Sequence, residues 1–160
     1  MKIPEGIKRA ATLIVLRHQN EFLLLKRLKA PNQGMYTPVG GKIDPFEGPK
    51  AAAIRETREE TGIIVEDIQF CGILTETSPI KYNWISYVYV ADIERVPPPP
   101  CNEGTLAWIT FDQLRDIPTP VTDLHIYECI ARGEKFVFTA EFDRDLQMVS
   151  MVEELSGKEI

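Results

Sequence analysis

The chain contains 160 residues, of which 44% are hydrophobic and 26% are charged. A domain of this size buries about 70% of the surface that its unfolded chain exposes, so it needs no disulfide scaffold. With 18 basic and 24 acidic side chains, the net charge is −6. This balance argues against nucleic acid as a partner, because nucleic acids select basic surfaces. It does not exclude a free nucleotide, since metal ions can carry positive charge to a phosphate.

Cysteine usage and hydropathy predict the compartment. The three cysteines are far apart and form no C-x-x-C pair, which is typical of reduced thiols: Cys71, Cys101 and Cys129. The apolar run 10–16 is too short to cross a bilayer and lacks the layout of a signal peptide. We therefore expect a cytoplasmic protein without a membrane partner, forming a single domain over residues 1–160. Whether it is a monomer or a homodimer is left open.

The first third of the chain alternates strand and loop patterns before a helix. Residues 9–18 and 21–28 are predicted strands, joined by a turn at Gln19-Asn20. A Pro- and Gly-containing loop then leads to Gly40-Gly41. A helix is predicted up to Thr61, since Gly48 suits the N-cap, Pro49 suits the first helical position and Gly62 suits the C-terminal stop.

The rest of the chain is mostly strand-like. We predict strands over 63–77, 82–93 and 106–110, an extended connection over 97–100, helices over 111–115 and 122–132, and a closing hairpin of 135–142 with 146–152. Strands on both sides of a helix, followed by a second helix, indicate an α+β fold with a mixed central sheet and flanking helices. Fold class alone says nothing about chemistry.

Three carboxylates on the predicted helix point to metal chemistry. Glu56, Glu59 and Glu60 stand at i, i+3 and i+4, so they share one helix face. Like charges at this spacing destabilise a helix, and Arg55 and Arg58 project to the sides of the face. Convergent carboxylates form the oxygen-rich ligand set that Mg²⁺ or Mn²⁺ accepts. A bare E-x-x-E-E is nevertheless also typical of a solvated acidic face.

The residues around these glutamates decide between the two interpretations. Segment 41–63 agrees with the pattern G-x5-E-x7-R-E-U-x-E-E-x-G-U, in which U is a bulky aliphatic residue, at Gly41, Glu47, Arg55, Glu56, Glu59, Glu60, Gly62 and Ile63. This pattern is the Nudix box, so the chain resembles the Nudix hydrolases, and the resemblance implies an α/β/α sandwich. The one departure is Thr57 at an aliphatic position, which concerns local packing rather than metal binding.

The resemblance implies roles for individual residues. It assigns a Mg²⁺ site, with Mn²⁺ as an alternative, to Glu59, Glu60, Glu56, Glu103 and the Gly40 carbonyl. It also implies that Arg55 pairs with Glu47 and orients the glutamate face. Nudix enzymes hydrolyse a nucleoside diphosphate linked to another group, with a metal-activated water attacking phosphorus. Either Glu56 or Glu103 is expected to take the proton of that water.

Weaker similarities outside the box concern the substrate. Segment 34–42 resembles the G-x-W-x-x-x-G-G-K stretch of the MutT and 8-oxo-dGTP diphosphatase branch, with Tyr36 in the Trp position. This resemblance places Tyr36, Gly41 and Lys42 at the substrate. Glu103, ahead of Trp108, matches the distal acidic residue of that branch. The predicted function is therefore Mg²⁺-dependent conversion of 8-oxo-dGTP to 8-oxo-dGMP and pyrophosphate.

Asp123 is the predicted base-reading residue, and two interpretations of it are open. Segment 117–123 resembles an L-P-x-P-x-x-D motif that places an acidic side chain near the base. Alternatively, Thr122 and Asp123 cap the following helix.

Two other functions also remain open. Pro79, sixteen residues after Ile63, lies near a proline that is associated with ADP-ribose pyrophosphatases. A non-catalytic nucleotide-sensing module is the third hypothesis, and the intact glutamate set argues against it.

Overall fold

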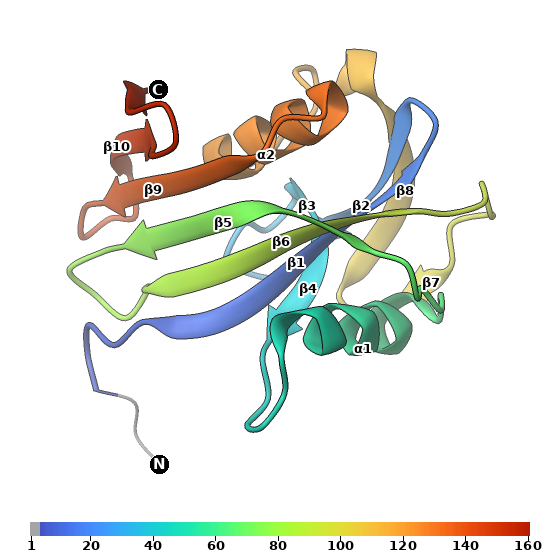
Figure 1. The fold of residues 1–160 in the computed structure, drawn as a ribbon, viewed down its shortest axis with the longest axis horizontal. Helices are drawn as coiled ribbons and strands as arrows, with labels where there is room; N and C mark the ends of the chain where they lie inside the picture. The colour runs from blue at the N-terminus through green and yellow to red at the C-terminus, as the bar shows by residue number, and fades with distance from the viewer. Residues whose placement is uncertain (1–3) are drawn as a thin grey trace.

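The computed structural model describes residues 4–160. Its elements in chain order are β1 (Arg9–His18), β2 (Glu21–Arg27), β3 (Tyr36–Thr37), β4 (Val39–Lys42), α1 (Pro49–Thr61), β5 (Gln69–Thr77), β6 (Trp84–Asp92), β7 (Pro100–Cys101), β8 (Gly104–Thr110), a short 3₁₀ turn (Phe111–Gln113), α2 (Val121–Arg132), β9 (Phe136–Phe142), β10 (Met148–Glu153) and β11 (Lys158–Glu159) (Figure 1). This is the expected α+β class.

The strands form one mixed sheet in the order β11-β10-β9-β5-β6-β1-β2-β8-β7, with β3 paired to β2 and β4 paired to β1. The β1–β6 and β5–β9 pairs are parallel, and the other pairs are antiparallel. One edge of β1 is shared between two partners. Residues 16–18 pair with β2, whereas residues 11–14 pair with β4. Because β4 pairs with β1, Gly40 and Gly41 lie directly beside Leu13 and Thr12 of this central strand.

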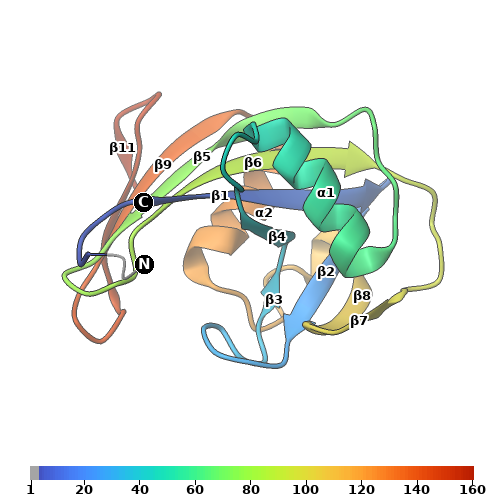
Figure 2. The same ribbon diagram turned by 90° about the horizontal axis from the view of Figure 1, so that it is seen from below.

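The two helices cover opposite faces of the sheet (Figure 2). On the α2 side, Ile126, Tyr127 and Ile130 pack against a cluster that includes Phe22 and Phe136. On the α1 side, Ala53 packs with Ile14, Leu23 and their neighbours. The alternation along β1 explains this division, since Val15 belongs to the first cluster and Leu16 to the second. The expected sandwich is therefore confirmed.

The prediction of a strand over 63–77 is wrong in its first part. The strand begins at Gln69, and residues 62–68 carry no strand. Val65 and Ile68 are buried in the cluster beneath α1, while Ile64 is 71% exposed. The buried positions are three residues apart rather than two, so this segment covers the core without the alternation of a strand.

Three shorter predictions also need correction. The predicted helix over 111–115 is only the 3₁₀ turn, which begins with a capping box between Thr110 and Gln113. The predicted loop before Gly40-Gly41 contains β3 and β4, because Pro38 between them interrupts the pairing for one residue only. The extended connection over 97–100 ends in β7, since Pro100 already pairs with Thr105.

The remaining predicted elements are confirmed to within two residues at each end, including the closing antiparallel hairpin of β9 and β10. Within the described residues, no helix is both long and apolar enough to cross a membrane.

Candidate active site

Helix α1 presents the glutamates because its other face is buried against the sheet. It begins after Gly48, has Pro49 in its first turn, and ends where Gly62 adopts φ 75° and donates its N–H to the Arg58 carbonyl. The buried residues are Ala52, Ala53, Thr57 and Thr61. The outer face carries Glu56, Glu59 and Glu60, as the periodicity predicts.

Thr57 occupies its aliphatic position without an unsatisfied hydroxyl. The side chain is fully buried, and its Oγ1 donates to the Ala53 carbonyl at 2.7 Å. Such a bond back to the preceding turn is the usual way in which a buried threonine satisfies its hydroxyl in a helix. The departure from the Nudix box therefore leaves the packing of α1 intact.

The two glycines of β4 bring backbone to the helix. The Gly40 N–H donates to Glu60 Oε2 at 3.2 Å. A Cβ atom on Gly40 would collide with the Thr12 carbonyl oxygen on the backbone of β1, whereas a Cβ atom on Gly41 would meet the movable end of the Glu56 side chain at 2.6 Å. Glycine is therefore required at position 40 for β4 to lie this close to β1. The role of the Gly40 carbonyl as a metal ligand stays a prediction.

Arg55 connects the loop, the strand and the helix. Its Nε and Nη2 bind the Glu47 carboxylate at 2.7 and 2.9 Å, and Nη2 also donates to the Lys42 carbonyl at 3.1 Å. Its Nη1 reaches Glu56 at 2.9 Å and Glu59 at 3.2 Å. The hydrogen bonds from Arg55 and from the Asp44 N–H lower the pKa of Glu47 to about 2. Arg55 thus touches two of the three helix glutamates and leaves Glu60 free.

A groove of about 530 Å³ joins the helix glutamates to the β7–β8 turn. Its lining includes Glu56, Glu59, Glu60, Cys101 and Glu103. Burial, followed by the nearby charges of Glu56 and Glu103, raises the pKa of Glu60 to about 7, although the Gly40 N–H opposes the rise. The tertiary structure therefore brings together all four carboxylates that the sequence singled out for metal binding.

This donor set fits a hard divalent cation, because four carboxylates share one groove and Glu60, which accepts the Gly40 N–H, has no ion-pair partner among residues 4–160. Within residues 4–160, no three His, Cys, Asp or Glu side chains are arranged to hold a metal ion as they stand. The reason is visible in the contacts: Glu56 and Glu59 are turned toward Arg55. A bound cation would compete with the Arg55 guanidinium for these two side chains.

None of the predicted substrate residues, which are Tyr36, Gly41, Lys42 and Asp123, is among the residues that line this groove. Tyr36 is half-buried; its N–H donates to the Pro118 carbonyl at 2.9 Å, and its carbonyl accepts the Tyr127 hydroxyl at 3.0 Å. Lys42 is exposed. Asp123 lies in the first turn of α2 with 7% of its surface exposed.

Asp123 is not a helix cap. The N-cap residue of α2 is Pro120, and no side chain caps the helix. The interpretation of Thr122 and Asp123 as capping residues is therefore wrong. Burial, and then the charge of Glu76, raise the pKa of Asp123 to about 8.

Glu76 and Tyr82 are polar neighbours of Asp123 that the sequence analysis missed. The Tyr82 hydroxyl donates to Glu76 Oε2 at 3.1 Å, and burial raises the pKa of Glu76 to about 7. A signal for Glu76 exists in the alternation of β5, because it stands two residues after the core residue Leu74 and so faces the same side. Tyr82 lies in a turn, where no periodicity marks it.

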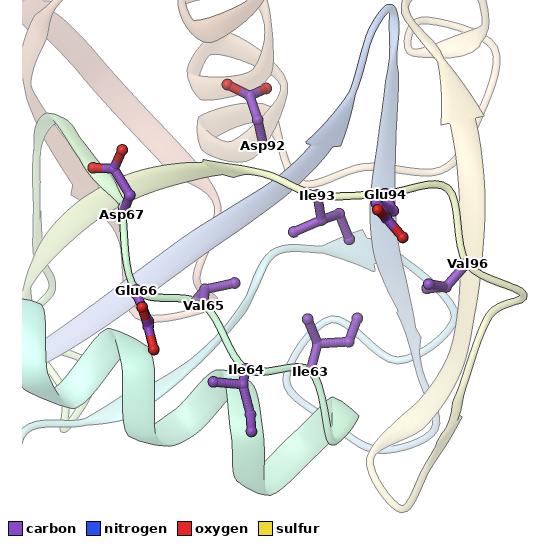
Figure 3. A pocket seen from close by; sticks show the side chains of 9 residues that line it. All are labelled: Ile63, Ile64, Val65, Glu66, Asp67, Asp92, Ile93, Glu94 and Val96. Atoms are coloured by element: carbon purple, nitrogen blue, oxygen red, sulfur yellow. The ribbon is translucent and has the colours of Figure 1, made fainter.

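A second hollow of about 300 Å³ lies between residues 63–67 and 92–96 (Figure 3). Its side chains are aliphatic or acidic, and Asp92 among them pairs with Arg17 at 2.7 Å. None of the predicted site residues lines this hollow.

A family model described as "NUDIX domain" matches residues 6–129. The chain belongs to the Nudix family. It is therefore a hydrolase of the kind that cleaves phosphoanhydride bonds.

Curated relatives of this Nudix hydrolase carry different activities in their names. It is 30% identical to the uncharacterized Nudix hydrolase YvcI of Bacillus subtilis over 82% of this chain and 88% of that protein. An 8-oxo-dGTP diphosphatase of Proteus vulgaris is 30% identical over 52% of this chain and 74% of its own length. The human diphosphoinositol polyphosphate phosphohydrolase 3-alpha is 30% identical over 56% of this chain and 54% of its own length.

Solved structures share the fold. A MutT protein from Bacillus halodurans superposes with a TM-score of 0.80 at 23% identity, covering 92% of this chain and 98% of that one. The NUDIX domain of Shewanella oneidensis NrtR, solved with ADP ribose, has a TM-score of 0.67 at 18% identity, covering 79% and 88%. At these identities the likeness concerns the fold alone.

Proposed function

We propose that this Nudix hydrolase, as a single domain over residues 1–160, is a Mg²⁺-dependent nucleoside triphosphate pyrophosphohydrolase that acts on oxidised purine nucleotides such as 8-oxo-dGTP. The observation that carries the proposal is the groove in which Glu56, Glu59, Glu60 and Glu103 converge over Gly40-Gly41. The relative named 8-oxo-dGTP diphosphatase supports the substrate class.

In this proposal Glu59 and Glu60 are the principal ligands of Mg²⁺ or Mn²⁺, with Glu56 and the Gly40 carbonyl as further ligands. A divalent cation bound there supplies positive charge to the phosphate oxygens and lowers the pKa of a bound water. Arg55 orients Glu56 and Glu59 through its hydrogen bonds, and Glu47 fixes Arg55 from the other side. Lys42 and the Gly41 backbone are the proposed partners of the phosphates.

Glu103 is the better of the two proposed bases. Glu56 is already engaged by a hydrogen bond from Arg55 Nη1 at 2.9 Å. Glu103 is exposed in the same groove, and no ion pair holds it within the described residues. It is therefore free to accept the proton of the attacking water.

Asp123 is the proposed base-reading group. It is buried and carries no cap hydrogen bond to α2; its Oδ1 accepts the Thr122 hydroxyl at 3.4 Å, and its Oδ2 is the oxygen proposed to meet the base. Tyr36 joins this region to the phosphate side, because its backbone is bonded to Pro118 and Tyr127 while Gly40, four residues later, meets Glu60.

A substrate panel with Mg²⁺ tests the proposal. Purified protein is incubated with 8-oxo-dGTP, dGTP, ADP-ribose and a diphosphoinositol polyphosphate, and pyrophosphate, AMP and orthophosphate are scored separately. We expect pyrophosphate from the triphosphates, and none from the Glu60→Gln variant. AMP from ADP-ribose as the main product would favour the ADP-ribose pyrophosphatase alternative. Orthophosphate from the diphosphoinositol polyphosphate would favour the activity named for the human relative, a diphosphoinositol polyphosphate phosphohydrolase. Binding without turnover would favour a nucleotide-sensing module.

A further inference from the structure

The hollow between residues 63–67 and 92–96 has an aliphatic interior. Two side chains from each segment form it, namely Ile63, Val65, Ile93 and Val96. Figure 3 shows these side chains pointing toward one another across the open space. At about 300 Å³, the hollow is at the lower end of the sizes that small-molecule pockets have. It therefore suits a short and slender ligand.

Acidic side chains stand on both walls of this hollow. Glu66 and Asp67 belong to the first wall, Asp92 and Glu94 belong to the second, and all four are exposed. Asp92 is paired with Arg17 at 2.7 Å, whereas the other three form no ion pair and no side-chain hydrogen bond within residues 4–160. None of the described residues that line the hollow is basic. A ligand that complements both walls therefore carries positive charge at two places.

The basic residue next to Glu94 does not neutralise the second wall. Arg95 donates to the Glu21 carboxylate at 2.7 Å, and its guanidinium lies 5.5 Å from the centre of the Trp108 ring. Its charge is thus engaged away from the hollow. The three unpaired acids keep their charge available to a cation from outside the chain.

We propose that this hollow binds a linear aliphatic diamine or polyamine. The methylene chain lies across the aliphatic interior, and an ammonium group at each end meets the acids of one wall. A metal ion makes no use of the aliphatic side chains, and a single lysine side chain brings one charge to two acidic walls. This inference goes beyond the proposed function, because none of the residues assigned to nucleotide hydrolysis lines the hollow.

Both walls of the hollow continue into the walls of the glutamate groove. Ile63 directly follows Gly62, which lines the groove at the end of α1. Val96 is followed by Pro97–Pro99 and then by Pro100, which lines the groove on the β7 side. A run of prolines is extended and stiff, so it transmits a displacement of one end to the other. A ligand that holds the two walls of the hollow together therefore also braces the two walls of the groove.

Calorimetry without nucleotide tests the binding. The probes are putrescine and spermidine, which carry more than one ammonium group, and butylamine, which has the carbon chain of putrescine but a single ammonium group. We expect putrescine to bind about threefold more tightly than butylamine or better, because its second ammonium meets the second acidic wall. This advantage should shrink as salt is added. Equal affinities would overturn the proposal in favour of a site for one cation, such as a lysine of a partner protein. Displacement of putrescine by an equal concentration of Mg²⁺ would overturn it as well.

Matched variants locate the ligand. Glu94→Gln removes the charge of one wall and the double variant Glu66→Gln/Asp67→Asn that of the other, and in each we expect putrescine to bind no better than butylamine. Val96→Ser makes the interior more polar and should weaken the binding of both amines. None of these side chains is buried, so the fold should persist. Glu159→Gln, which removes an exposed acid on β11, is the control and should keep the wild-type affinities. Wild-type affinity for putrescine in the double variant would refute the site.

Turnover measures whether the ligand braces the groove. Rates are recorded at limiting Mg²⁺, with the nucleotide that the substrate panel identifies, in the presence and absence of putrescine. We expect putrescine to raise the rate of the wild type about fivefold and to leave that of Glu94→Gln unchanged. An equal response of the two proteins would come from the amine binding the nucleotide and would overturn the bracing. If no nucleotide is hydrolysed but calorimetry shows binding that depends on both walls, the proposed function fails and the diamine site stands.

Discussion

The two faces of the sheet use the same functional group in opposite ways. On the α1 face, four glutamates line an open groove, and Arg55 bonds two of them directly. On the α2 face, Glu76 and Asp123 are buried, and within the described residues no cation is hydrogen-bonded to their carboxyl oxygens. The first environment favours charged carboxylates that can take a metal ion. The second favours a protonated carboxyl that can donate a hydrogen bond.

The environment of an acidic side chain, and not its residue type alone, decides whether the carboxyl group is charged. Glu47 and Glu76 are both glutamates in the same fold, yet the pKa of Glu47 is held at about 2 by Arg55 and that of Glu76 is raised to about 7 by burial. The following predictions test this difference between the acids of the α1 face and those of the α2 face, and the largest expected effect comes first.

Removing charge from the groove should nearly abolish turnover. We expect Glu59→Gln or Glu60→Gln to lower kcat at least about 100-fold, because a lost metal ligand no longer helps to stabilise developing charge. The fold should persist, and thermal stability without metal should hold or rise, since Glu60 is disfavoured in its charged form. Steady-state kinetics at saturating Mg²⁺ and a melting curve check both points. Near-normal turnover in both variants would contradict the assignment.

Replacing the orienting arginine should have a smaller effect. Lysine cannot reproduce the forked contacts of Arg55 with Glu47, Glu56 and Glu59. We expect Arg55→Lys to lower kcat about 10- to 100-fold and to weaken Mg²⁺ activation, as is typical when a residue that orients metal ligands is changed. A Mg²⁺ titration of the rate measures both. Arg115→Lys, in an ion pair with Glu128, is the matched control and should leave the titration curve unchanged.

The buried pair should make stability depend on pH. Unfolded carboxyls ionise near pH 4, whereas the folded pKa values of Glu76 and Asp123 are about 7 and about 8. Their contribution to stability is therefore fully present below about pH 4 and is lost as the pH rises through about 7 to 8. Glu76→Gln should reduce this loss and raise the melting temperature at alkaline pH by a few °C. Melting curves at about pH 5 and about pH 9 test the sign, and an equal loss in wild type and variant would refute it.

Restoring the aliphatic residue of the Nudix box should change least. Thr57→Val replaces a fully buried hydroxyl that is bonded to the Ala53 carbonyl by a methyl group of similar size. Since one intramolecular hydrogen bond has a small net worth, we expect the free energy of unfolding to change by no more than about 1.5 kcal/mol and kcat to stay the same. Urea denaturation and kinetics provide the measurement. A marked fall in kcat would show that α1 positions its glutamates through this residue.

Local sequence signals were enough to predict the glutamate-bearing helix and the family. The bounds of α1, the positions of its glutamates and the glycines before it follow from local signals: caps, helical periodicity and the spacing of the Nudix box. The first two strands and the closing hairpin could also be predicted, because alternation and turn residues act over a few positions.

The proximity of residues that are far apart in sequence could be read only from the tertiary structure. The contact of Glu103 with the helix groove depends on β7 and β8 lying at one edge of the sheet, and the burial of Glu76 and Asp123 depends on α2 packing over β5. The segment 63–68 is not a strand because its side chains fill the space beneath α1, although its composition is strand-like. These outcomes depend on strand order and long-range packing, which local patterns do not encode.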